Sequence, residues 1–369
     1  MAKQGSAPTY WDYLKLDRLL QLQNGMEPDD ARLASDELHF IVVHQIYELW
    51  FKLVLRELRQ GRDQLAAPRV PEETLPHVVH HLRRVNEILK LAADQFRVVE
   101  TLTPQDFLDF RDKLVPASGF QSFQMREIEL LLGLEEEQRR AIGGSDPIDH
   151  IRKMAHESPG GRDAWARVEA ARQEKTLRSA LHDWLHRTPI QASAPSDPGD
   201  AAVVDAFMRE YMAAFEEQHG AQTEHLVQAG LGSAGALRDR FESNVRRARE
   251  FLLAEDVTEN QRERRRRIRA GILFIESYRD LPLLAWPRLL VDTIVELEEL
   301  LVIWRSRHAR MAERVIGRRV GTGGSPGVDY LDQTAQYRIF VDLWSVRTLL
   351  LPREALPALR DPTFYGFAV

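Results

Sequence analysis

A single apolar stripe through residues 290–315 limits most strongly what this chain can fold into. Its members recur at alternating steps of four and three residues, the spacing of one face of an α-helix. The stripe consists of Leu290, Ile294, Leu297, Leu301, Trp304, His308, Met311 and Val315. Gly317 follows, and glycine ends helices readily because it adopts the left-handed conformation without penalty. We therefore expect one long, core-facing helix that stops just before a glycine-rich loop.

His308 is the histidine of this stripe, while the charged residues Glu298 and Arg305 fall beside it. A buried imidazole needs a partner for its ring nitrogens, and a backbone carbonyl, a carboxylate or a metal would each serve. Taken alone, such a histidine is more often a hydrogen-bonded core residue than a ligand, because buried polar groups are usually satisfied. A second histidine is needed before the ligand interpretation is favoured.

The loop after this helix, residues 321–327, reads GTGGSPG. It follows a helix rather than a strand and has no closing Lys-Ser/Thr pair, so we reject a phosphate-binding P-loop. Glycines let the backbone approach a ligand closely, and one interpretation is a lid that sets the Thr322 hydroxyl against a small polar group. A flexible connector is the other.

Composition narrows the classes of protein that remain. With 369 residues and 44% hydrophobic content, the chain can bury one large core or two modest ones. The net charge of -6 does not suit a nucleic-acid binder. The absence of cysteine excludes disulfides, thiolate nucleophiles and iron–sulfur clusters. No run of about 18 apolar residues suits a membrane span and no signal peptide is visible, so we expect a cytoplasmic protein.

A start signal at residues 35–38 predicts a second long helix that runs to residue 58, and it is apolar on two faces. One face carries Leu38, Ile41, Val42, Leu49 and Leu53. The opposite side gathers Phe40, His44, Tyr47 and Phe51. His44 therefore lies in an aromatic wall, either as a hydrogen-bonded core histidine or facing a ligand.

Arg111 is the third polar residue on an apolar surface. Thr103 and Pro104 predict the start of a helix, because threonine caps and proline suits the first turn. On that helix Phe107, Arg111 and Leu114 share one face. A partly buried arginine needs a carboxylate, either structural or on a ligand.

The rest of the chain reads as helical, with no credible strand set or repeat, and we expect a single all-α domain over residues 1–369. An N-terminal arm, residues 1–25, holds a short amphipathic helix over 10–23 that leads with Tyr10 and Tyr13. Another amphipathic helix is expected over 76–99. Glycine and proline are frequent in residues 143–202, which we interpret as a surface insertion. We expect helices there at about 163–186 and, just beyond, 201–218, joined by an exposed loop.

Three segments together resemble the tryptophan 2,3-dioxygenase family. They are FIVVHQIYELWFK with His44, TPQDFLDFRDKLVPASGFQS with Arg111, and RSRHARMAERVIGRRVGTGGSPGVDYL with His308 and Thr322. The resemblance covers nearly the whole chain outside residues 143–202. It implies an all-helical bundle that encloses a b-type haem, assembled as a homotetramer. The implied reaction opens the indole ring of L-tryptophan with O2 to give N-formylkynurenine.

The resemblance also implies roles for single residues. His308 resembles the proximal ligand of the haem iron, and His44 the distal histidine that hydrogen-bonds the indole N–H. Arg111 matches the clamp on the substrate carboxylate, and Thr322 the residue beside its ammonium and carboxylate. The remaining matches are the apolar pocket of Phe40, Phe107 and Leu114, the loop of Ser118 and Gly119 over the haem, and Tyr10 and Tyr13, which a neighbouring subunit contributes. One ligating and one non-ligating histidine suit a haem that needs its second face open.

Two positions depart from the family pattern: Phe107 replaces a tyrosine of some relatives, and Pro326 a usual serine. The exact indole substrate is therefore left open. The first alternative is a related haem oxygenase that acts on a substituted indole or another aromatic amino acid, or inserts one oxygen atom. The second is a non-catalytic haem-binding sensor, and the third a helical scaffold with structural histidines. An amino-acid clamp of Arg111 and Thr322 argues against a sensor.

Overall fold

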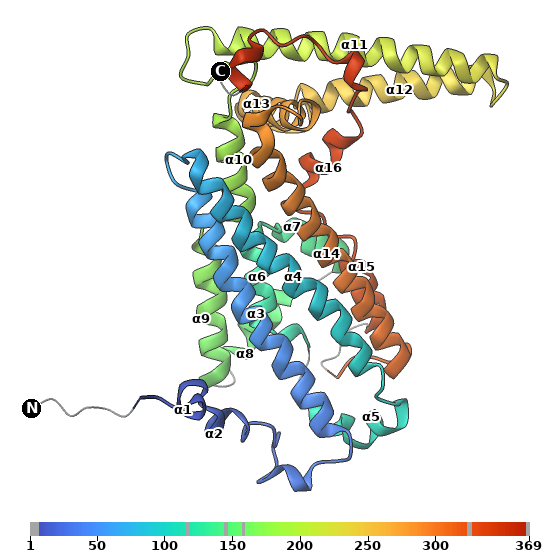
Figure 1. The fold of residues 1–369 in the computed structure, drawn as a ribbon. Coiled ribbons are helices and arrows are strands. Elements are labelled where there is room, and N and C mark those ends of the chain that lie inside the picture. The colour runs from blue at the N-terminus through green and yellow to red at the C-terminus, as the bar shows by residue number, and fades with distance from the viewer. Residues whose placement is uncertain (1–6, 116–118, 144–146, 157–158, 323–326, 367–369) are drawn as a thin grey trace, which may run out of the picture.

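The computed structural model describes residues 7–115, 119–143, 147–156, 159–322 and 327–366, which are mainly α-helical (Figure 1). Within these ranges the only β-type pairing is an isolated bridge between Ile190 and Ser193. The all-α fold that the sequence predicted is confirmed.

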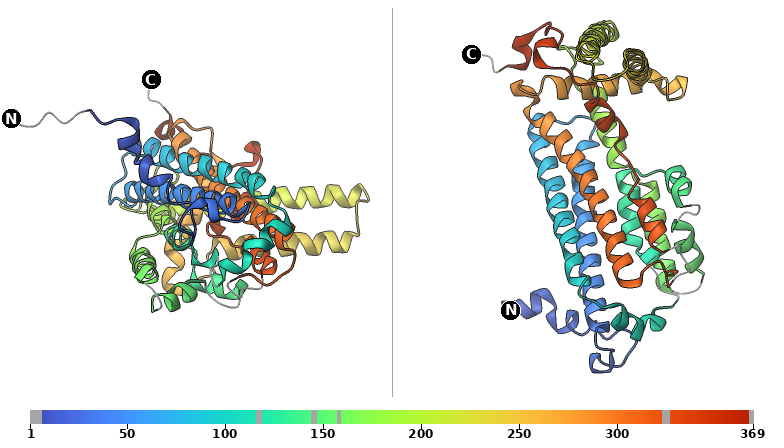
Figure 2. Two further views of the ribbon diagram at one scale, coloured as in Figure 1. Left: turned by 90° about the horizontal axis from the view of Figure 1, so that it is seen from below. Right: turned by 90° about the vertical axis from the view of Figure 1, so that its right-hand side faces the viewer.

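Three long helices form the centre of the molecule. They are α3 (Glu37–Leu65), α4 (Leu75–Val99) and α14 (Ala285–Ile316). They run side by side, and α4 packs against both of the others (Figures 1 and 2). The apolar residues of the predicted stripe on α14 are all buried, and the helix ends before Gly317, whose φ is 58°. Both the stripe and the stop signal are confirmed.

Burial on α14 extends beyond its apolar stripe. Glu298 is 2% exposed and its carboxylate accepts hydrogen bonds from the backbone N–H of Ile339 and Phe340 and from the Trp344 indole. Arg305 is 5% exposed and donates to Glu129 at 2.9 Å. Charged residues beside the stripe therefore join α14 to the segments that cover it.

Shorter helices cover one side of this bundle. They are α5 (Pro104–Arg111), α6 (Phe123–Leu132), α7 (Glu136–Gly143), α8 (Pro147–Met154), α9 (Pro159–Gln173), α10 (Leu177–Arg187) and α15 (Val328–Thr334). Helix α6 packs on α3, α9 on α6, and α15 on α14. The predicted cap of α5 is confirmed, because the Thr103 hydroxyl accepts from the Asp106 N–H at 3.2 Å.

The stretch 143–202 differs from its prediction in two ways. One expected helix over 163–186 is two, because Thr176 starts α10 by accepting from the Ser179 N–H at 3.0 Å. The connection after α10 was expected to be exposed, which holds for residues 195–199, whereas its first part is buried, with Ile190 0% and Gln191 4% exposed. Helix α10 itself packs against α3 and α13. That this stretch is an insertion remains a prediction.

A C-terminal strap, residues 357–365, holds the buried first part of that connection in place. The Tyr365 hydroxyl accepts from the Ala192 N–H at 2.8 Å, and the Gln191 side chain bonds the backbone of Ala358 and Arg360. Gln191 and Ala192 have φ of 53° and 62°, a conformation that costs free energy for residues other than glycine. The strap therefore stabilises a strained turn.

A helical pair projects from one end of the bundle. Helices α11 (Asp200–Gln228) and α12 (Ala234–Leu252) lie against each other, and the base of the pair rests on α13 (Glu259–Ser277). Helix α16 (Val341–Arg347) lies at the same end (Figure 1). Helix α11 continues ten residues past the predicted end at 218.

The N-terminal arm lies at the other end of the bundle (Figure 1). Instead of one helix over 10–23 it forms α1 (Tyr10–Leu14) and α2 (Leu16–Leu19), separated by Lys15 at φ 56°. Neither helix contains a buried residue. The arm therefore makes little use of its own chain as a core.

Helix α3 keeps an apolar surface on its outer side. Leu38 is 37% and Leu49 51% exposed, whereas Tyr47 and Phe51 on the other face are buried. Among the described residues, α3 is the one helix whose length and composition would fit a membrane span. Core helices of soluble proteins meet that criterion too, and α3 packs against α4, α6 and α10.

Candidate functional site

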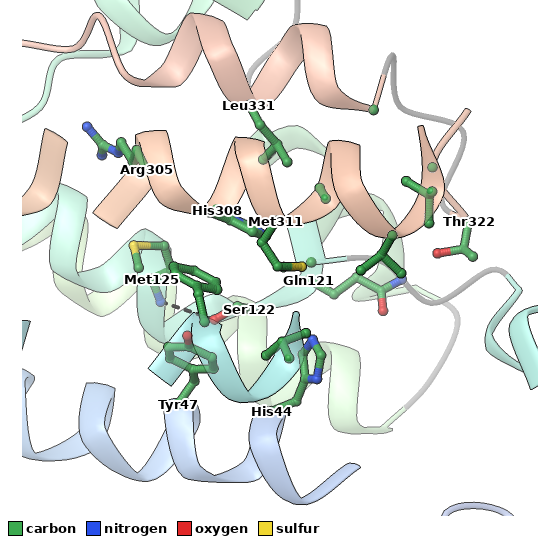
Figure 3. Close-up of a pocket in the computed structure, with 18 of the residues that line it drawn as sticks. His44, Tyr47, Gln121, Ser122, Met125, Arg305, His308, Met311, Thr322 and Leu331 are labelled. Carbon is green, nitrogen blue, oxygen red and sulfur yellow. Dashed lines mark hydrogen bonds between the residues drawn. The ribbon is translucent and has the colours of Figure 1, made fainter. Parts of the chain in front are cut away.

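A cavity of about 560 Å³ lies between the inner sides of α3, α4, α6, α14 and α15, within the range of pockets that enclose an organic ligand. In Figure 3, His308 and Met311 project into it from α14, and His44 and Tyr47 face them from α3. The structure brings together most of the predicted site residues in its wall: Phe40, His44, Phe107, Arg111, Leu114, Gly119, His308 and Thr322.

Three predicted site residues are not placed in this wall. Tyr10 and Tyr13 lie on α1, where they are 68% and 77% exposed, and neither lines the cavity of its own chain. Ser118 lies outside the described residues. The site roles of these three residues stay predictions.

His308 presents a neutral imidazole to the cavity. Burial lowers its pKa to about 4, and the nearby His44 and Arg126 act in the same direction. Phe96 and Trp304 pack against its ring. A neutral imidazole nitrogen has a lone pair available for a metal ion. Among the described residues no cluster of three His, Cys, Asp or Glu side chains is arranged to hold a metal ion.

His44 faces the same cavity with its tautomer fixed. Its Nδ1 lies 2.7 Å from the carbonyl oxygen of Phe40, so Nδ1 carries the proton and donates it. Nε2 is then an acceptor. Burial lowers the pKa of His44, while the Phe40 carbonyl and the charge of Glu48 oppose that decrease. The free nitrogen of His44 therefore suits a ligand that offers an N–H group.

Arg111 and Thr322 come from segments far apart in the chain, and both line the cavity. Arg111 ends α5, and its Nη2 donates to the carbonyl of Val320 at 2.8 Å. This bond ties the guanidinium to the loop that carries Thr322 and leaves its other N–H groups for a ligand. A planar guanidinium with several donors is well suited to a carboxylate.

Gly327 shapes the neck of that loop. Its φ is 64° and ψ is −124°, and a Cβ there would lie 2.6 Å from the carbonyl oxygen of Arg319. Such a contact is not tolerated, so only glycine at position 327 lets the backbone there lie this close to the backbone of Arg319. The structure thus gives a physical reason for a glycine at this end of the loop.

Sequence reasoning missed a buried ionic group at the opposite end of the cavity from Thr322, where Figure 3 shows Arg305. Arg126, Glu129 and Arg305 are all buried, with Glu129 3.0 Å from Arg126 and 2.9 Å from Arg305. The only signal was an Arg and a Glu three apart in α6, on a helix rich in apolar residues. The triad carries one excess positive charge next to a largely apolar space.

Comparisons with known proteins agree on one family. The sequence model described as "Tryptophan 2,3-dioxygenase" matches residues 1–350. "Tryptophan 2,3-dioxygenase" of Sorangium cellulosum is 48% identical over 367 residues, covering 98% of this chain and 87% of that protein. "Tryptophan 2,3-dioxygenase 2" of Ralstonia nicotianae is 48% identical over 371 residues, covering 98% of each. "Tryptophan 2,3-dioxygenase" of Dictyostelium discoideum is 33% identical over 360 residues, covering 95% and 85%.

Proposed function

The chain belongs to the tryptophan 2,3-dioxygenase family, and from this premise we propose that it is an oxidoreductase that opens the indole ring of L-tryptophan with O2. The product is N-formylkynurenine, the first step of tryptophan catabolism through the kynurenine pathway. One observation supports this most directly: His44 and His308 face one cavity whose wall also carries Arg111 and Thr322. A hydrogen-bond acceptor for an N–H group and a clamp for a carboxylate suit L-tryptophan.

In the proposed binding mode, each polar group of L-tryptophan has a partner in the cavity wall. The indole N–H donates to Nε2 of His44, whose other nitrogen is held by Phe40. The carboxylate binds Arg111, and the ammonium and carboxylate lie beside Thr322. Phe40, Phe107 and Leu114 supply the apolar walls around the indole. A site built for a hydrogen bond discriminates strongly against analogues that lack the group.

The family is haem-dependent in general, and the cavity of this chain fits haem b. His308 offers a neutral imidazole into an apolar space, and the buried Trp304 indole N–H has no hydrogen-bond partner among the described residues, as expected of a wall built against a ligand. His308 would hold the iron, with Gly119 near the haem face. The haem iron supplies the centre at which O2 is activated. The chain itself binds the substrate, orients the indole and excludes water.

Replacing His44 with alanine is expected to keep haem and to reduce turnover. The substitution removes one hydrogen bond to a neutral group, ~0.5–1.5 kcal/mol, or a factor of about two to ten in kcat/KM. Steady-state kinetics and the absorption spectrum of purified protein measure both properties. As a control, 1-methyl-L-tryptophan lacks the N–H group, so its affinity should be low for the natural protein and little changed by His44→Ala. Loss of haem in this variant would contradict a distal role.

We further propose that the protein is a homotetramer in which the arm around Tyr10 and Tyr13 reaches the cavity of a neighbour. The exposure of Tyr10, Trp11 and Tyr13, all above 60%, supports this assembly because large aromatics rarely stay in water without a partner. The outer face of α3 gives further apolar surface for such contacts. A cytoplasmic location is proposed with it.

Deleting residues 1–15 is expected to raise KM for L-tryptophan while leaving haem bound, because the arm would complete the substrate pocket but not the haem site. Michaelis kinetics and the haem spectrum of the truncated protein test this. The double variant Tyr10→Ser, Tyr13→Ser is the matched comparison, since it removes the two rings and keeps the backbone of the arm. Unchanged kinetics in the truncated protein would show that the arm does not complete the site.

The decisive experiment for the function is product identification with L-tryptophan under ¹⁸O2. N-formylkynurenine with both new oxygen atoms labelled is the expected result. A product with one labelled oxygen atom would favour the related oxygenase, as would turnover of a substituted indole in preference to L-tryptophan. A protein that binds haem and does not turn over any indole would favour the sensor.

A further inference from the structure

His308 differs from most metal-binding histidines in how the described residues hold its ring. Such a residue generally donates its second ring N–H to a carboxylate, a backbone carbonyl or a water, which fixes the angle of the ring. Among the described residues, no hydrogen bond joins His308 to a partner, whereas Nδ1 of His44, the other histidine of the cavity wall, lies 2.7 Å from the Phe40 carbonyl oxygen. The contacts that the described residues make with the His308 ring are therefore packing contacts.

Two aromatic rings, those of Phe96 and Trp304, pack against His308. The Phe96 ring lies 5.5 Å from it between centroids and only 10° from parallel. Trp304 lies at 5.3 Å and 46°. Ring centroids 4.5–7 Å apart in an offset parallel arrangement are an attractive geometry. Phe96 is therefore the neighbour whose plane matches that of the imidazole.

Phe96 is itself held firmly. It lies on α4, the helix packed between α3 and α14, and is 3% exposed. Its ring also packs against Tyr47 at 5.4 Å, and the Tyr47 hydroxyl donates to the Ala92 carbonyl of α4 at 2.9 Å. A ring fixed by the central bundle can transmit its orientation to a neighbour that stacks on it.

We propose that Phe96 is the positioning residue for the His308 imidazole, setting the ring plane by stacking where other metal sites use a hydrogen bond. This inference rests on the proposed function, in which His308 holds the haem iron.

The test compares Phe96→Leu with Phe51→Leu in the purified haem protein. Phe51 is a matched control: it also lines the cavity, is 4% exposed, and packs on Tyr47 and Trp304, while its ring makes no contact with His308. The readouts are the iron–histidine stretching band in the resonance Raman spectrum of the ferrous protein, and the rate at which haem transfers to apomyoglobin.

In Phe96→Leu the iron–histidine band should broaden and haem should dissociate about two to ten times faster, the effect of losing one aromatic pair. Phe51→Leu should leave the band unchanged. Phe96→Trp, which restores an aromatic plane, should give a narrow band again and keeps the proposal testable should the leucine variant fail to fold.

An unchanged band in Phe96→Leu, equal broadening in both leucine variants, or a Phe96→Trp band as broad as that of Phe96→Leu would overturn the proposal. Its failure is distinguishable from failure of the proposed function. If the natural protein itself shows no iron–histidine band, haem ligation by His308 is wrong, and the positioning role of Phe96 is overturned with it.

Discussion

Replacing His308 with alanine is expected to yield a folded protein without stably bound haem. In the proposed site His308 makes the only bond from the chain to the iron, and the other histidine in the described cavity wall, His44, lies on α3. The absorption spectrum of the purified variant should lack the Soret band, and added imidazole should restore part of it by filling the vacated space. A variant that keeps full haem with a histidine-ligated spectrum would contradict the assignment.

The same variant should also be less stable than the haem-bound natural protein. A ligand present at 100 times its Kd stabilises the folded state by ~2.7 kcal/mol through mass action, and His308→Ala forfeits that contribution. His182→Ala is a suitable control, since His182 is a buried histidine on α10 away from the cavity. It should keep its haem, so haem loss in His308→Ala alone would separate ligation from general damage to the fold.

Replacing Arg111 with leucine is expected to reduce kcat/KM for L-tryptophan severely. Removing one partner of a desolvated, charge-assisted pair costs ~2–5 kcal/mol, a loss of tens- to thousands-fold. The natural protein should also strongly prefer L-tryptophan to 3-methylindole, which has no carboxylate. Steady-state kinetics with both substrates, on both proteins, measure the two effects together.

The comparison of substrates is needed because Arg111 has a second contact. Its bond to the Val320 carbonyl is lost in Arg111→Leu as well, and a shifted loop would affect any ligand. Turnover of 3-methylindole reports that structural loss, and the additional loss with L-tryptophan reports the clamp. Arg111→Lys, which keeps the charge but not the paired donors, should lie between. If kcat/KM falls equally for both substrates, Arg111 is structural and the related indole oxygenase is the preferred function.

The periodicity of the sequence predicted α14 well because one face of that helix is uniformly apolar. Its stripe, its end at Gly317 and the position of His308 on the stripe all follow from residue spacing. Glu298 and Arg305 could not be predicted as buried, because their partners come from residues 339–344 and from Glu129. Such contacts depend on how distant segments pack, which the period of one helix does not encode.

In the candidate site too, some features follow from residue spacing and others depend on how distant segments pack. His44, Arg111 and His308 each stood out as a polar side chain on an apolar surface, and the structure places all three around one cavity. The tautomer of His44 and the bond from Arg111 to Val320 could not be predicted from the sequence, because each depends on the position of a single carbonyl oxygen. The two apolar faces of α3 were visible in the sequence, but spacing does not reveal which one faces the cavity.

The hydrogen bond between Tyr365 and the turn at Ala192 can form only late in the synthesis of this protein. The two residues are 173 positions apart, and a ribosome adds roughly 5–20 residues per second. The turn after α10 is therefore synthesised about ten to thirty-five seconds before the residue that locks it. Helices α3 and α4 are neighbours in the chain and can pair during that interval, since short-range contacts form first. The end of the molecule that bears the strap can therefore reach its final structure only after the ribosome has added residue 365.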